Sequence, residues 1–139
     1  MPPLIPLSLH LTALAFGGFG AWLLIWPAAL GTLGLELTTP AAVTEVRAFY
    51  GGFELGCAAF FVLAARRPAW HEPGLVLQVT SLGGAAIARL AGVVVDGTRE
   101  RLMFGLMSAE AVGAAIGLWL LWRTRAVRPR RRSHARRRA

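Results

Sequence analysis

Three residues that could do chemistry, Arg47, Tyr50 and Glu54, lie close together in the stretch RAFYGGFE, which is otherwise apolar and rich in glycine. A guanidinium binds carboxylates and other anions, a phenol hydroxyl can donate or accept, and a carboxylate accepts hydrogen bonds or carries a proton. Arg47 and Glu54 are seven residues apart, which is two turns of an α-helix, and Tyr50 lies between them. The spacing therefore predicts a polar cluster on one helical face.

Two more ionisable residues, Arg89 and Glu110, interrupt later apolar segments. Each charge at the centre of a membrane helix costs about 2.5–3.5 kcal/mol on insertion scales, so such residues face inward and form pairs. Two arginines and two glutamates make a formally neutral set. We therefore expect Arg47, Tyr50, Glu54, Arg89 and Glu110 to form one buried polar cluster or ligand-binding site. Three secondary members are expected beside it: Glu45, Asp96 and Gln78.

Four long apolar segments must position these residues. About 20 apolar residues at 1.5 Å per residue cross a hydrocarbon core of about 30 Å, and each segment reaches that length. Short connections favour an up-and-down packing. The sequence therefore predicts an all-α, integral membrane four-helix bundle over residues 1–122, with helices at about Leu7–Ala29, Ala41–Ala65, Pro73–Val95 and Arg99–Trp122.

The first apolar segment could instead be a cleaved signal peptide. Residues 1–35 contain no Asp, Glu, Lys or Arg. A signal peptide usually begins with a basic region and has a shorter apolar core. A retained membrane helix is therefore the favoured interpretation.

The formal net charge of +8 comes from one end of the chain, because nine of the fifteen arginines lie in residues 123–139. This segment is predicted to be a disordered, arginine-rich cytoplasmic tail. Arg66 and Arg67 fall on the same side of a four-span topology, and arginine excess marks the cytoplasmic face. We therefore predict a multi-pass protein of the bacterial inner membrane with both termini in the cytoplasm.

The partners expected from these features are the lipid bilayer and, for the tail, anionic lipid headgroups. No aromatic residue is interleaved with the tail arginines, which argues against binding of nucleic acid through base stacking. Small residues at Gly52-x-x-x-Gly56 and Gly113-x-x-x-Gly117 allow helices to approach closely. Packing within the chain is the preferred use of these motifs, and homo- or hetero-oligomerisation is the other.

The sequence lacks the residues that several common kinds of catalytic or binding site require. The three histidines are far apart in the predicted topology, so neither a metal site nor a serine triad is predicted. The single cysteine, Cys57, excludes an internal disulfide and a cysteine cluster. No glycine-rich loop follows a strand, so no nucleotide site is predicted and no cofactor is expected.

The segment Glu45-x-Arg47-Ala48-x-Tyr50-Gly51-Gly52-x-x-Leu55-Gly56 resembles a family of small bacterial membrane proteins, the domain of unknown function 4345. Ala88-Arg89, Asp96-Gly97 and Glu110 also match, and the resemblance extends from about residue 5 to residue 122. It implies a four-helix membrane domain and no assigned reaction. The arginine tail lies outside it.

Three functions are compatible with this pattern. The first is binding or transport of a small amphipathic ligand at the polar cluster, which would open to the outer side. The alternative is a non-catalytic structural or accessory subunit of a membrane complex, whose buried charges only fix helix packing. The third is an enzyme acting on a lipid or quinone-like substrate, which rests only on the carboxylates and Tyr50.

Overall fold

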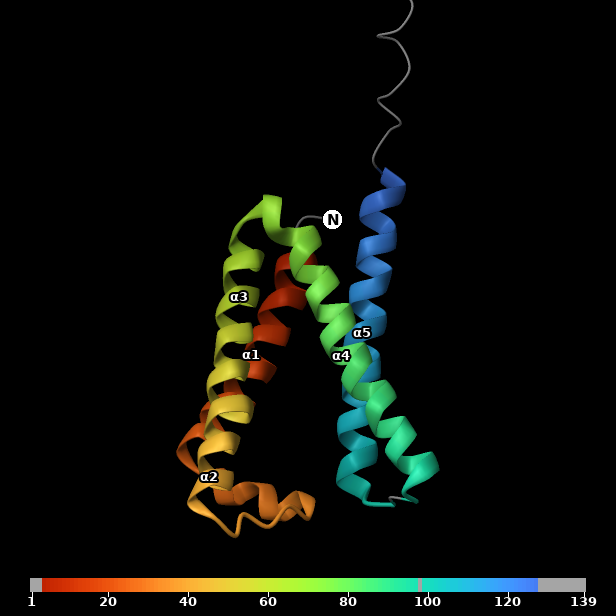
Figure 1. The fold of residues 1–139 in the computed structure, drawn as a ribbon. Helices are drawn as coiled ribbons and strands as arrows, with labels where there is room; N and C mark the ends of the chain where they lie inside the picture. Colours follow the sequence, from red (N-terminus) through yellow and green to blue (C-terminus); the bar gives the residue numbers. More distant parts are fainter. Residues whose placement is uncertain (1–3, 98, 128–139) are drawn as a thin grey trace, which may run out of the picture.

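The computed structural model describes residues 4–97 and 99–127, and this part of the chain contains helices and no strands. The α-helices are α1 (Leu4–Ile25), α2 (Pro40–Val46), α3 (Glu54–Arg66), α4 (His71–Val95) and α5 (Arg101–Val127) (Figure 1). Three other helical segments are η1 (Pro27–Leu33) and η3 (Pro68–Trp70), which are 3₁₀ turns, and η2 (Arg47–Phe53), which is a π-helix. The prediction of an all-α fold is confirmed.

Four helical stretches are long and apolar enough to cross a membrane, and they have 22 to 28 residues. At 1.5 Å per residue the shortest spans about 33 Å, which exceeds a hydrocarbon core of about 30 Å. The second span is continuous from Pro40 to Arg66 through α2, η2 and α3. Large apolar side chains such as Leu14, Ile25 and Val94 face outward, where a bilayer would cover them. The predicted multi-pass membrane bundle is therefore confirmed.

The ends of two helices differ from the predicted bounds. The first α-helix stops at Ile25, because Pro27 lacks a backbone N–H and its ring disfavours the α conformation of the preceding residue. The last helix continues to Val127, so Arg123 and Arg125 belong to α5 rather than to a disordered tail. The rest of the predicted tail, residues 128–139, lies outside the described residues. Thr39 caps α2, because its side chain accepts a hydrogen bond from the Ala42 N–H at 3.1 Å.

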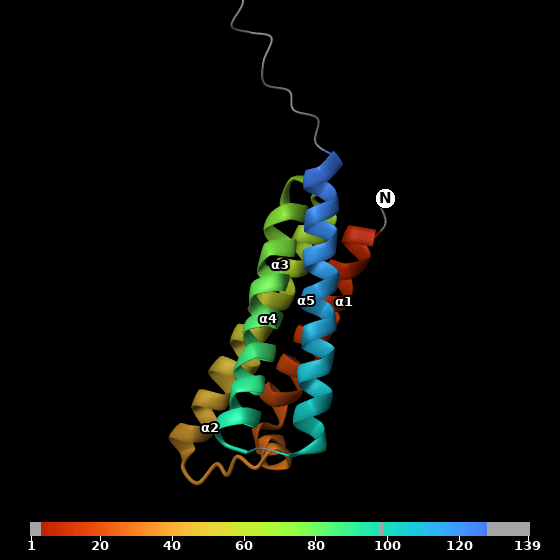
Figure 2. The same ribbon diagram turned by 90° about the vertical axis from the view of Figure 1, so that its right-hand side faces the viewer.

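The four spans form two antiparallel hairpins. Helix α1 packs along α3, and α4 packs along α5, whereas contacts between the two hairpins are fewer (Figures 1 and 2). One apolar core joins all four spans near the start of α1, and it contains Leu9, Ala13, Phe61, Ala64, Ala65, Leu75, Leu120 and Leu121. A smaller core of Leu23, Ala29, Leu30 and Val46 joins α1 only to η1 and α2 at the other end. The hairpins consequently meet at one end and diverge toward the other (Figure 1).

Glycines permit the closest contacts within and between the hairpins. A Cβ atom placed on Gly20 of α1 would lie 2.8 Å from Glu54 Cβ, and one placed on Gly51 would lie 3.0 Å from Leu24 Cα. Gly113 and Gly117 of α5 similarly face side chains of α4, as intrachain packing predicts. The other motif behaves differently, because neither Gly52 nor Gly56 faces another helix.

The contact at Gly20 predicts a position-specific effect of alanine. Gly20→Ala should lower the free energy of unfolding by about 1–3 kcal/mol, because the added methyl meets the backbone and Cβ of the second span and cannot be accommodated by rotating a side chain. Gly18→Ala is the matched control, because a Cβ there meets nothing within 4 Å. Unfolding in mixed micelles of increasing SDS content would measure both. Equal stabilities of the two variants would contradict the described α1–α3 contact.

Candidate functional site

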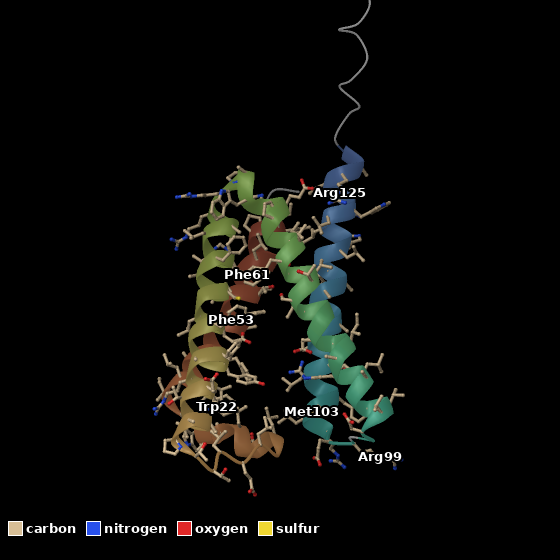
Figure 3. All side chains as sticks on the ribbon, viewed as in Figure 1. Trp22, Phe53, Phe61, Arg99, Met103 and Arg125 are labelled. Carbon is tan, nitrogen blue, oxygen red and sulfur yellow. The ribbon has the colours of Figure 1, made fainter. Side chains whose placement is uncertain are left out.

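A partly open cavity of about 1240 Å³ lies between the two hairpins. Its walls come from α1, η2, the first residue of α3, α4 and α5, and Leu30, Leu33 and Leu35 close part of the end where the hairpins diverge. Phe53 and Met103 line it from opposite hairpins (Figure 3). Most lining side chains are apolar. The polar ones are Ser8, Thr12, Tyr50, Glu54, Gln78, Ser81, Arg89, Glu110 and the indole of Trp119.

An ion pair closes the α4–α5 side of the cavity. Arg89 Nη1 donates hydrogen bonds to both carboxylate oxygens of Glu110. The Arg89 side chain is 28% exposed and the Glu110 side chain is 16% exposed, so the pair is largely buried within the protein. Helix α4 presents Gln78, Ala85 and Arg89 to the cavity at intervals of seven and four residues, which place them on one face of the helix.

Tyr50 and Glu54 stand on the opposite hairpin. Tyr50 lies in η2 and Glu54 is the first residue of α3, one π turn apart on the cavity wall. Glu54 is close enough to both Arg89 and Glu110 to interact with them electrostatically. Neither Tyr50 nor Glu54 makes a side-chain hydrogen bond to any residue that the structure describes. Four of the five predicted cluster residues thus line one cavity.

Arg47 does not join them. Its Nε donates to the carbonyl oxygen of Leu24 at 3.3 Å, its side chain is exposed, and it does not line the cavity. The prediction assumed a regular α-helix between Arg47 and Glu54, but the intervening residues form a π-helix. Because a π turn holds one more residue than an α turn, positions beyond it are rotated by about 100°. The expected neutral set of two arginines and two glutamates therefore does not form at the cavity, because Arg47 lies outside it.

Two of the secondary residues also lie elsewhere. Glu45 is exposed on α2, and Asp96 is exposed at the C-terminal end of α4, where Gly97 adopts a positive φ of 70° and ends the helix. Neither lines the cavity. Glycine suits position 97, since it adopts a positive φ without steric cost.

The third secondary residue, Gln78, is central to a buried hydrogen-bond junction. Its Nε2 donates to Ser8 Oγ at 3.0 Å and to the Gly113 carbonyl at 2.9 Å, and Ser8 Oγ donates to Gln78 Oε1 at 3.1 Å. Thr12 completes the set by donating to the Ser8 carbonyl at 3.0 Å. Ser8, Thr12 and Gln78 are the buried polar residues of the described chain, and they join α1, α4 and α5.

Ser8 and Thr12 were not predicted as site residues. A serine or threonine inside an apolar helix usually bonds to a carbonyl of its own helix, as Ser108 does here, so its type alone does not indicate an interhelical contact. The spacing of four residues, which places Ser8 and Thr12 on one face, was the signal available in the sequence.

The arrangement offers an apolar space with a few polar groups on its wall. Apolar walls could cover a hydrophobic body, and the uncommitted hydroxyl and carboxylate could orient one polar group. The arginine, by contrast, is already held by Glu110.

The Arg89–Glu110 pair should stabilise the bundle measurably. Arg89→Ala should lower the free energy of unfolding by about 2 kcal/mol, because it leaves Glu110 without the charged donor that holds it. Arg125→Ala is the control, since its contact with Glu72 is exposed and should contribute less than about 1 kcal/mol. The double variant Arg89→Ala/Glu110→Ala should lose less than the sum of the single variants. Additive losses would show that the pair does not form.

Neither a curated protein nor a solved structure matches this chain. One family profile does, and it covers residues 6–121, which is most of the chain and reaches into all four spans. This agrees with the extent of the resemblance that the motifs around Arg47 and Arg89 predicted. The chain belongs to the family described as Domain of unknown function (DUF4345).

Proposed function

We propose that this protein binds a small amphipathic molecule in the cavity between its two hairpins, as a carrier, sensor or transporter of that molecule. The observation that supports this is a large apolar cavity whose wall carries two polar side chains, Tyr50 and Glu54. Neither side chain is hydrogen-bonded to a described residue. A polar cluster that only fixes helix packing is expected to pair its polar groups within the chain.

The size of the cavity fits this function. Small-molecule sites commonly have volumes of about 300–1,000 Å³ and combine apolar walls with a few polar groups. The volume of about 1240 Å³ is somewhat above this range and is enough for a single-chain amphiphile. The divergence of the hairpins gives such a molecule a path to the site at the end away from the shared core.

The second candidate is a non-catalytic accessory subunit of a membrane complex. The Arg89–Glu110 pair favours it, because both charges are satisfied within the chain, as a device that only fixes helix packing would require. Chemical cross-linking in native membranes distinguishes the two. A chain recovered only as free monomer would argue against the accessory role.

We further propose that the protein resides in a bacterial inner membrane with both termini in the cytoplasm. Arg66, Arg67, Arg123 and Arg125 lie at the end of the bundle where α1 begins (Figure 3 labels Arg125). Arg99 and Arg101 stand at the other end. Arginines beside a membrane surface attract anionic headgroups by about 1 kcal/mol each, so the C-terminal segment would contact acidic lipid.

Blocking the cavity should abolish binding. Ala109→Trp places an indole in the cavity beside Glu110, whereas Ala111→Trp, on an exposed position outside the lining, is the matched control. In native mass spectrometry of protein purified in a mild detergent, the wild type and Ala111→Trp should retain a co-purified small molecule. Ala109→Trp should lose it. Identical spectra of the three proteins, with no bound molecule, would contradict the proposed function.

The orientation predicts the behaviour of reporter fusions. A green fluorescent protein joined after Val127 should fluoresce, because that reporter folds in the cytoplasm, whereas alkaline phosphatase inserted at Gly97 in the α4–α5 turn should be active. A dark fluorescent protein after Val127, or inactive phosphatase at Gly97, would refute the four-span orientation. Cytoplasmic reporters inserted between Arg67 and Pro68 provide the internal control, since this connection lies at the same end.

A further inference from the structure

Most polar groups of the cavity already have partners, which limits what can recognise a ligand. The Ser8 and Gln78 side chains are hydrogen-bonded to each other, and Thr12 donates to the Ser8 carbonyl. Ser81 donates to the Leu77 carbonyl of its own helix at 2.7 Å. Arg89 and Glu110 hold each other. Of the hydroxyl, carboxyl, amide and guanidinium groups on the cavity wall, those of Tyr50 and Glu54 are the two without a hydrogen bond to a described residue.

The charges on the wall do not cancel. Arg89 contributes +1, and Glu54 and Glu110 contribute −1 each, so the formal charge is 1 − 2 = −1. The second arginine of the predicted quartet would have made the sum zero, but Arg47 is bound to the Leu24 carbonyl outside the cavity. The excess negative charge therefore resides on Glu54, opposite a pair that is already neutral.

A carboxylate in apolar surroundings is costly unless a proton or a cation compensates it. Glu54 has aromatic neighbours that favour compensation by a cation. Tyr50 and Phe53 line the cavity within four residues of it, and Phe16 and Phe19 of α1 line the same cavity. Aromatic faces attract organic cations by about 0.5–2 kcal/mol. An ammonium group on an apolar body matches both the carboxylate and the rings.

We propose, on the basis of the ligand-binding function above, that the ligand is a cationic amphiphile whose amine or quaternary ammonium pairs with Glu54. Its apolar part occupies the space between the hairpins, and Tyr50 flanks the charged group. Arg89 does not serve as the recognition residue. Its role is to hold Glu110, so that Glu110 does not bind the cation in place of Glu54. An anionic amphiphile is excluded by the net charge of the wall.

Three probes of one chain length test the charge preference in the full-length protein in maltoside micelles: decyltrimethylammonium, decanol and decyl sulfate. The wild type should bind the ammonium probe about tenfold more tightly than decanol, which corresponds to about 1.4 kcal/mol for one charge-assisted contact. Decyl sulfate should bind most weakly. Equal affinity for all three probes, or a preference for the sulfate, would overturn the proposal while leaving the ligand-binding function intact.

The residue assignment is tested by removing one charge. Glu54→Gln keeps the shape of the side chain and should abolish the preference for the ammonium probe, with decanol affinity changed less than about twofold. Glu45→Gln is the matched control, because Glu45 is exposed outside the cavity and its charge should not matter. A cation preference that survives Glu54→Gln would overturn the assignment. Failure of every probe to bind the wild type would instead refute the proposed function itself.

Discussion

The arrangement of this protein depends on one buried amide. Gln78 is almost fully buried, and its hydrogen bonds reach Ser8 on α1 and the Gly113 carbonyl on α5. A bilayer supplies no water to satisfy such groups, so each must find its partner inside the protein. The amide thus links the two hairpins at a fixed register. The apolar core around Leu9, Phe61 and Leu75 then packs on that junction.

The two hairpins owe their internal contacts to small residues instead. Lipid tails are as apolar as the helices, so helix association in membranes depends on close packing more than on the hydrophobic effect. Gly20 and Gly51 bring α1 against the second span, and Gly113 and Gly117 bring α5 against α4. Tight pairs joined at one end leave a space between them, and the cavity that fills it is lined from Leu4 and Leu120 at the joined end to Leu35 at the other.

The sequence predicted the four spans and five polar residues that line the cavity, namely Tyr50, Glu54, Gln78, Arg89 and Glu110. Apolar runs longer than 20 residues define the spans, and the intervals between Gln78, Ala85 and Arg89 define a helical face. It did not predict the placement of Arg47, because nothing in its local pattern signals the π-helix that follows. That segment forms where Gly51 is pressed against Leu24, and this tertiary contact is visible only in the structure.

The position of the Gln78 junction has a mechanical consequence. From Gln78 to the end of α4 at Val95 there are 17 residues, or about 26 Å of helix at 1.5 Å per residue. Because Gln78 lies nearer the start of α4 than its end, a 5° rotation of the helix about this junction would displace its far end by about 2 Å. A small rotation of α4 about this junction would therefore change the separation of the two hairpins at the end where they diverge.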